Sequence, residues 1–415
     1  MTITGTHAVP RHPGERPALE GASIICFAHD WGGDPTSKTH IMKILARKNR
    51  ILWVNSIGMR RPAASGRDLR RILDKLAKGF RGCREVEPNL FVANPLVIPL
   101  PGWGVADRIN AGILAASLRR LCRRHALRDP ILWSFLPNVG RLLGRLNERM
   151  VIYHCVDEYS AFSGVSRETL ARLERDLVRR ADLVLTSSER LCAERIATNP
   201  NTRFVTHGVD VGHFAQALQP GTGTPDDLRD LPRPVIGFFG LLADWVDLDL
   251  VRAMALARPG WSFVLVGKQA TGVGAVRGLP NVHLLGQKPY ALLPAYCRGF
   301  DVGIIPFRTN DLTLRANPLK LREYLAAGLP VVSTPLPEVA RYQPFVHLAS
   351  DATGFSRAIS VALGERSPAQ DRTRALAMES ESWETRVAEI ERHISRTAGR
   401  AGYPALHPAM SASSP

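Results

Sequence analysis

A lysine and a glutamate one helical turn apart, Lys320 and Glu323, could together hold a nucleotide. They lie in the segment 301–334, where an apolar strand precedes a polar loop, a helix and a second strand. Asn317 and Pro318 suit the start of that helix, whose free amides, together with the Lys320 ammonium, would attract a diphosphate. The Glu323 carboxylate could accept two ribose hydroxyls. The alternative interpretation is a solvated ion pair on an amphipathic helix.

A histidine and two acids follow an apolar strand in the first half of the chain. The segment 153–162 (YHCVDEYSAF) places His154, Asp157 and Glu158 at the end of that strand and in the loop after it. A carboxylate there could remove a proton from an attacking hydroxyl, so Asp157 is the candidate base and His154 its neighbour. The alternative is that Asp157 caps a turn and that His154 is a hydrogen-bonded residue at a strand end.

Glycine turns after two expected strands could let a ligand approach the backbone closely. Gly32 and Gly33 follow the first apolar strand, and Gly240 ends a strand in the second half. Lys268, after a neighbouring strand, could add positive charge beside Gly240. The chain contains no G-x-G-x-x-G motif, so a dinucleotide oxidoreductase loses its main sequence support.

Metal ligation is not expected from the sequence. The six cysteines lie far apart, with no C-x-x-C pair and no histidine at zinc-finger spacing. Asp247 and Asp249 are two residues apart in a helical pattern, so their side chains diverge. These patterns predict no essential metal and favour a reduced, cytoplasmic protein.

Short apolar segments alternate with helical patterns along most of the chain. The strands expected in the first half are residues 23–28, 50–55, 89–93, 130–135, 150–155, 182–187 and 202–206. Those expected in the second half are residues 235–240, 262–267, 281–285, 301–306, 330–334 and 345–348. Such alternation predicts an α/β protein with two Rossmann-like, doubly wound parallel-sheet domains. The ligand site is expected in the cleft between them, where the carboxyl ends of both sets of strands meet.

The chain has 415 residues, which suits two domains with termini that lack apolar periodicity. No signal-peptide core and no window of about 18 uninterrupted apolar residues is present. The expected divisions are a disordered tail (1–20), an acceptor-binding domain (21–214), a linker rich in proline and glycine (215–233), a nucleotide-binding domain (234–380), a helix returning to the first domain (381–398) and a second disordered tail (399–415).

The charge is strongly positive, with 54 Lys and Arg against 38 Asp and Glu, a formal net charge of +16. The segment 60–84 alone carries nine basic residues and two aspartates. Four more arginines share one expected helix: Arg119, Arg120, Arg123 and Arg124. A basic face interleaved with leucines suits anionic lipid headgroups, the alternative being a merely solvated surface. Nucleic acid is not the expected partner, because Phe80 is the single aromatic residue of the segment 60–84, which leaves no series of rings for stacking on bases.

Several of these segments resemble one enzyme family. The segment 323–332 (EYLAAGLPVV) is similar to the donor-nucleotide segment of the family 4-like glycosyltransferases with the GT-B fold, also called glycosyl transferases group 1. Supporting likenesses lie at 205–214 (VTHGVDVGHF), 286–307 and 382–394 (SWETRVAEIERHI), in the family's order. The resemblance covers nearly all of residues 21–398. It implies that Glu323 binds the donor ribose and that Gly32 and Gly33 admit the donor sugar and the acceptor.

The chain departs from the family's pattern at two places. The family usually has another glutamate eight positions before the ribose glutamate, where this chain has Arg315. Many relatives also have a basic residue soon after the turn that holds Gly240, whereas this chain continues LLADWVD, so Lys320 and Lys268 would have to supply that charge. The segment N-P-x-K-x-x-E-Y-L-A-A-G is most similar to exopolysaccharide and teichuronic-acid type transferases. The missing acid leaves both a retaining and an inverting course open.

The resemblance implies transfer of a sugar from a nucleoside-diphosphate sugar to a hydroxyl of a saccharide or polyprenyl-linked saccharide, in cell-surface polysaccharide biosynthesis. The donor is a co-substrate, and no other cofactor is implied. The expected location is the cytoplasm, with peripheral contact to the inner face of an anionic membrane. The alternatives are a nucleotide-sugar epimerase of the same fold and a non-catalytic basic protein that binds membranes or nucleic acid.

Overall fold

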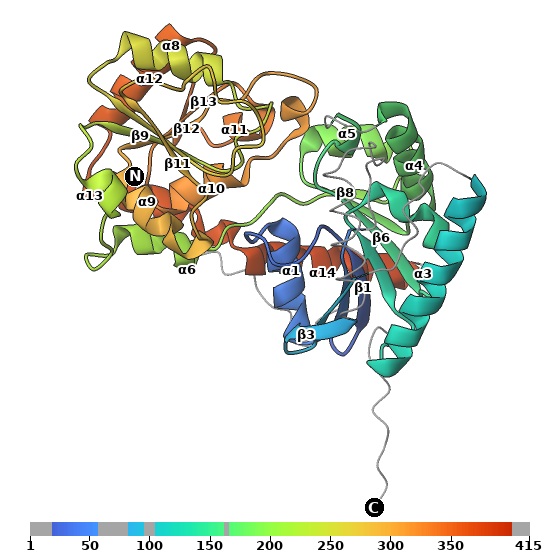
Figure 1. Cartoon of the computed structure of the whole chain (residues 1–415). Coiled ribbons are helices and arrows are strands. Elements are labelled where there is room, and N and C mark those ends of the chain that lie inside the picture. Colours follow the sequence, from blue (N-terminus) through green and yellow to red (C-terminus); the bar gives the residue numbers. More distant parts are fainter. Residues whose placement is uncertain (1–18, 57–81, 95–103, 162–165, 401–415) are drawn as a thin grey trace, which may run out of the picture.

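The computed structural model describes residues 19–56, 82–94, 104–161 and 166–400, which form two α/β halves (Figure 1). Nearly all of both predicted tails, and residues 60–81 of the basic segment, lie outside the described residues. Leu19, near the end of the first predicted tail, is fully buried. The two halves confirm the predicted fold class, since each is built on a mainly parallel sheet.

The first sheet has eight strands in the order β3-β4-β2-β1-β5-β6-β7-β8. The strands are β1 (Ser23–Phe27), β2 (Arg50–Val54), β3 (Cys83–Glu87), β4 (Leu90–Ala93), β5 (Ile131–Ser134), β6 (Met150–Cys155), β7 (Leu183–Thr186) and β8 (Thr202–Phe204). Only the pair β3–β4 is antiparallel among these described strands. Strand β3 (CREVE) was not among the strands expected from the sequence, because its charged residues hide the apolar pattern of a strand. An exposed edge strand can carry such residues.

The second sheet has six parallel strands in the order β11-β10-β9-β12-β13-β14. The strands are β9 (Val235–Phe239), β10 (Ser262–Val266), β11 (Val282–Gly286), β12 (Val302–Ile305), β13 (Val331–Ser333) and β14 (Val346–Leu348). The chain leaves β9 toward β10 on one side and returns to pair β12 on the other. Ligands bind outside the carboxyl ends of strands at such a switch point, where the Gly240 turn lies.

Helices cover both sheets on both faces. The central strands are therefore buried along their whole length. The α-helices are α1 (Ser37–Ala46), α3 (Gly104–Arg124), α4 (Arg167–Arg180), α5 (Glu189–Ile196), α6 (Val211–Phe214), α7 (Asp226–Arg229), α8 (Leu248–Ala257), α9 (Leu293–Gly299), α10 (Leu319–Ala326), α11 (Pro337–Ala340), α12 (Ala352–Gly364), α13 (Pro368–Ala377) and α14 (Trp383–Arg400). The 3₁₀ turns are η1 (Pro137–Leu142), η2 (Tyr159–Ala161), η3 (Ala215–Leu218), η4 (Tyr290–Leu292), η5 (Thr313–Arg315) and η6 (Glu379–Glu381). Across the described ranges, no helix combines the length and hydropathy required to cross a bilayer.

The segment between the sheets, predicted as the linker 215–233, carries η3 and α7, and both pack on α9. The Asp227 carboxylate accepts a hydrogen bond from Tyr296 Oη at 2.8 Å and pairs with Lys288 Nζ at 2.7 Å. This segment is therefore attached to the second half. The domain bounds themselves stay a prediction.

The last described helix, α14, crosses from the second half to the first (Figure 1). Trp383, Val387 and Ile390 belong to the hydrophobic core beside the first sheet. A Cβ at Gly208 would lie 2.8 Å from the backbone of Trp383, so only glycine allows this approach. The helix extends to Arg400, two residues beyond the predicted end.

Ion pairs join the two halves beside η5. Arg315 Nη2 lies 2.9 Å from Glu194 Oε1, and Arg315 Nε lies 3.9 Å from Glu158 Oε2. The same guanidinium is 3.3 Å from Asp311 of its own half. Arg195, on α5, lies 2.8 Å from Glu158 and 2.7 Å from Glu194, so each of these acids faces both Arg195 and Arg315. The position that carries an acid in the resembling family therefore binds acids of the first half.

We expect Ile390→Ala to lower the free energy of unfolding by about 2 to 5 kcal/mol, because Ile390 is fully buried and the change leaves a cavity between α14 and the first half. Denaturant unfolding measures the loss. The exposed Arg392→Ala on the same helix is the control and should stay within about 0.5 kcal/mol of the parent. An equal, small effect of both changes would show that α14 does not stabilise the first half.

We expect Arg315→Ala to lower the free energy of unfolding by about 1 to 3 kcal/mol, since it leaves partly buried carboxylates without one of their partners. Arg167→Ala is the matched control, because Arg167 pairs only with the exposed side of Asp311 in the described contacts, at 3.1 Å. Its effect should be under about 1 kcal/mol. Hydrogen exchange of residues 157–161 should rise in the Arg315 variant alone, and unchanged exchange would contradict a role at the junction.

Candidate functional site

Lys320 lies in the first turn of α10 and against the turn that follows β9. Gly240 has a φ of +137°, and a Cβ there would lie 3.1 Å from Lys320 Cε. The Lys320 ammonium lies 5.2 Å from the ring centroid of Phe238 and 4.7 Å from that of Phe307. Strand β9 and the segment directly after β12 thus supply aromatic faces that position this cation beside the positive end of a helix. Such an arrangement attracts an anion.

Glu323 lies one helical turn beyond Lys320, as the spacing predicted. Burial lowers the pKa of Lys320 and raises the pKa of Glu323, and the charge of each residue opposes the shift of the other. The Glu323 carboxylate also acts on Tyr290 of η4, whose pKa is raised by burial and then by this charge. The pair is therefore not a freely solvated one, and a ligand that supplies an anion and hydroxyls would satisfy both groups.

The glycines after β9 and β10 touch each other. A Cβ at Gly267, where φ is +157°, would lie 1.8 Å from the carbonyl oxygen of Gly240. Leu242 N donates a hydrogen bond to Lys268 O at 3.0 Å, and the Lys268 side chain is exposed. The fold therefore brings Gly240, Lys268 and Lys320 to one end of the second sheet, with Glu323 beside them.

Asn317, predicted to bind nucleotide, uses its side chain at the domain junction. Its Nδ2 donates hydrogen bonds to Ser187 O at 2.7 Å and to Thr206 Oγ1 at 2.9 Å, both in the first half. Its Oδ1 accepts a hydrogen bond from Arg322 Nη1 at 2.7 Å. Asn317 thereby fixes the start of α10 against the first half, and direct contact with a nucleotide stays a prediction.

In the first half, His154 lies at the end of β6 and is almost fully buried. Its ring stacks on Phe135 with centroids 4.9 Å apart, and Nδ1 has no hydrogen-bond partner among the described residues. Burial, helped by the charge of Lys38, lowers the pKa of His154 to about 3. The imidazole is therefore neutral, and its buried Nδ1 makes no hydrogen bond with the described residues.

Asp157 follows β6, and its carboxylate lies within electrostatic range of Lys38, which was not identified from the sequence. Burial raises the pKa of Asp157 to about 6, while the charge of Lys38 opposes this shift. Lys38 lies in the first turn of α1, with its ammonium 5.8 Å from the ring centroid of Tyr159. The sequence signal for Lys38 was its place directly after the loop that holds Gly32 and Gly33. Lys38 is 119 positions from Asp157 in the sequence (157 minus 38), so no local pattern connects the two residues.

Gly32 and Gly33 lie in the loop that precedes α1. Gly32 has a φ of +106°, both glycines are exposed, and a Cβ on either would meet no described atom within 4 Å. In the same loop, Asp34 accepts a hydrogen bond from Gln287 Nε2 at 2.8 Å, which connects it to the second half. The loop therefore lies at the junction of the two halves, and contact of Gly32 and Gly33 with the donor sugar or the acceptor stays a prediction.

The two aspartates considered for metal binding have protein partners. Asp247 caps α8 by accepting a hydrogen bond from Leu250 N, and it lies 3.5 Å from Arg308. Asp249 lies 2.8 Å from the same guanidinium. This arrangement gives both carboxylates a structural role.

Comparison with known proteins gives a family match in the second half and a wider match in fold. Residues 233–365 match the family model described as glycosyl transferases group 1. A Bacillus subtilis protein provisionally named teichuronic acid biosynthesis glycosyltransferase TuaH is 31% identical over 231 residues, which cover 52% of this chain and 58% of that protein.

Solved structures of other proteins share the arrangement of both halves. Sucrose-phosphate synthase from Thermosynechococcus elongatus aligns over 92% of this chain and 100% of its own, with a TM-score of 0.67 and 16% identity. Anabaena HepE, solved with UDP, aligns over 90% of this chain and 100% of its own, with a TM-score of 0.62 and 16% identity. The resemblance seen in the sequence is thus supported: residues 233–365 match the group 1 glycosyl transferase model, and the two halves have the GT-B fold that the resemblance implied.

Proposed function

We propose that the protein transfers a sugar from a nucleoside-diphosphate sugar to a hydroxyl of a saccharide or lipid-linked saccharide, in cell-surface polysaccharide biosynthesis. The observation that carries this proposal is the position of Lys320 against the Gly240 turn, with Glu323 one helical turn further on. Two comparisons support it: HepE has been solved with UDP-glucose, and TuaH is named for teichuronic acid biosynthesis.

In this proposal the donor binds at the end of the second sheet. The Lys320 ammonium, the amides at the start of α10 and the exposed Lys268 balance the charge of the diphosphate. The same positive charge stabilises that diphosphate when it leaves, which lowers the barrier for breaking the sugar–phosphate bond. Glu323 accepts hydrogen bonds from the ribose hydroxyls, and the absence of a side chain at Gly240 lets the phosphates approach the backbone.

The acceptor binds at the end of the first sheet. Its hydroxyl oxygen attacks the anomeric carbon of the donor sugar, the bond to the diphosphate oxygen breaks, and Asp157 takes the hydroxyl proton. The neutral His154 ring forms a hydrogen bond with a sugar hydroxyl, and Lys38 holds Asp157 in its charged form. Gly32 and Gly33 give the two sugars room. Direct displacement of this kind inverts the anomeric carbon.

The proposed location is the cytoplasm, with the first half in contact with the inner face of the cell membrane. All six cysteines lie in the described residues and are free thiols, as in proteins of a reducing compartment. The high net positive charge favours an anionic surface.

We expect Glu323→Ala to weaken the affinity for a nucleoside diphosphate by about 1 to 3 kcal/mol, because the ribose hydroxyls would lose their acceptor. Isothermal titration with UDP, ADP and GDP measures the affinity, after a thermal-shift panel that includes nicotinamide cofactors. The exposed Glu379→Ala is the matched control in the same half and should bind as the parent does. Unchanged affinity in Glu323→Ala, or strongest stabilisation by a nicotinamide cofactor, would refute the donor site.

We expect kcat/KM to fall about tenfold per pH unit below about pH 6, because the raised pKa of Asp157 leaves its carboxyl protonated and unable to accept a proton there. Asp157→Asn should lower turnover by roughly a hundredfold or more and leave nucleotide affinity nearly unchanged. The exposed Glu168→Gln is the control. Normal turnover in Asp157→Asn, or a product with retained anomeric configuration, would place the base elsewhere.

A further inference from the structure

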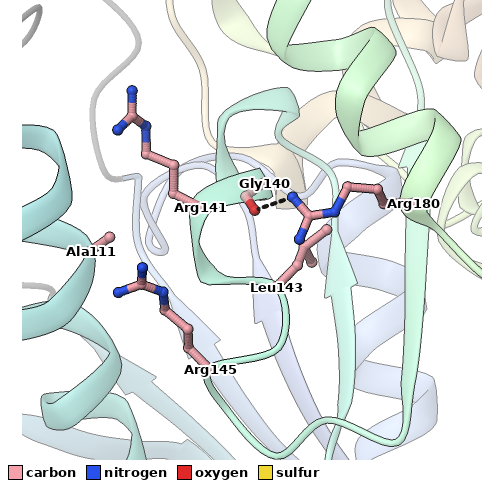
Figure 2. Close-up of a pocket in the computed structure, with 6 residues that line it drawn as sticks. All are labelled: Ala111, Gly140, Arg141, Leu143, Arg145 and Arg180. Atoms are coloured by element: carbon pink, nitrogen blue, oxygen red, sulfur yellow. Dashed lines mark hydrogen bonds between the residues drawn. The ribbon is translucent and has the colours of Figure 1, made fainter. Parts of the chain in front are cut away.

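The connection from β5 to β6 leaves a hollow on the outer face of the first sheet. In place of a full helix, the chain makes the short turn η1 and then an irregular segment that reaches β6. Between α3, this connection and the end of α4 lies a volume of about 270 Å³ (Figure 2). Its lining consists of Ala111, Gly140, Arg141, Leu143, Arg145 and Arg180. We call it the arginine hollow.

Three guanidinium groups surround the arginine hollow. Figure 2 shows Arg141 and Arg145 extending from the connection on the side of α3, while Arg180 reaches in from α4. Arg180 is held in place, because its Nη1 donates hydrogen bonds to Gly140 O at 2.9 Å and to Asp176 Oδ2 at 3.2 Å. Arg141 and Arg145 are exposed at the rim.

The acids near the arginine hollow are already engaged. Asp176 pairs with Arg179 at 3.1 Å as well as with Arg180. Glu148 accepts hydrogen bonds from Gly144 N and, at 3.0 Å, from Leu146 N. Its carboxylate therefore binds backbone amides of the β5–β6 connection. Among the described side chains, the three arginines of the lining outnumber the one acid, Asp176, that pairs with them. Guanidinium groups match the geometry of phosphate oxygens.

The surroundings favour a phosphate that belongs to a surface. Ala111 and the partly exposed Leu143 give the hollow an apolar side. Further along α3, Arg120 and Arg123 are exposed. Arginines beside exposed apolar groups suit the headgroup layer of an anionic bilayer. The lining has no aromatic ring on which a nucleic-acid base could stack.

We propose that the arginine hollow binds the phosphate of an anionic lipid headgroup and so attaches the first half to a membrane. This makes specific the membrane contact of the proposed function, but it does not depend on the transferase activity. The site is separate from the donor site, since its lining comes from α3, the β5–β6 connection and α4 of the first half.

The test is sedimentation of the purified full chain with vesicles of phosphatidylglycerol and phosphatidylcholine, against vesicles of phosphatidylcholine alone. We expect binding to the anionic vesicles only. The double variant Arg141→Ala/Arg145→Ala should reduce it roughly 30-fold, because each basic residue near an anionic surface contributes about a fivefold gain in affinity. Both residues are exposed, so circular dichroism should show an unchanged fold.

The matched control is Arg392→Ala/Arg396→Ala, which removes the same charge from exposed positions on α14, at the opposite face of the first sheet. An equal loss in both double variants would overturn the arginine hollow in favour of diffuse attraction. Two further outcomes would also overturn the proposed lipid site. In one, the parent protein does not bind the vesicles but binds inorganic phosphate. In the other, it binds an RNA oligonucleotide through the same arginines. Glu323→Ala should bind vesicles as the parent does, so this test fails or succeeds separately from the donor site.

Discussion

The buried guanidinium of Arg322 holds together the parts on which the candidate site depends. The side chain is 1% exposed, and it donates hydrogen bonds to Asn317 Oδ1 at 2.7 Å and to Thr206 Oγ1. Its Nε lies 3.3 Å from Glu381, and it stacks on Tyr342 at 4.9 Å. A buried charge is stable only when such partners surround it. One residue of α10 thereby connects the first half, the second half and the turn that leads to α14.

The contacts of Arg322 determine where the two lysine–acid pairs of the candidate site lie. Lys320 and Glu323 lie on the helix that Arg322 anchors, and Lys38 and Asp157 lie on the first half that it anchors to. In each pair a lysine lies in the first turn of a helix, and burial shifts its pKa down while the acid opposes the shift. Two half-desolvated pairs on different domains suit a reaction that brings a phosphate and a hydroxyl together.

Arg315 couples the two halves through ion pairs. In the resembling family this position carries an acid, whereas here the guanidinium faces Glu158 and Glu194 of the first half. Glu158 directly follows Asp157, so the ion pairs tie the loop of the candidate base to the segment that begins the donor helix. Where the family has an acid, this chain therefore has an arginine that links the second half to the first.

The sequence by itself determined the two series of strands and the segment that holds Lys320 and Glu323. Continuous apolar runs must be buried, and one helical turn separates residues three apart in any helix. It did not determine β3, whose charged residues are permitted by an exposed edge. Only the tertiary structure decided that Lys38 lies within electrostatic range of Asp157, that Asn317 binds the first half, and that Arg315 faces Glu158. These interactions join residues more than a hundred positions apart, and no local pattern encodes which distant partner a polar side chain meets.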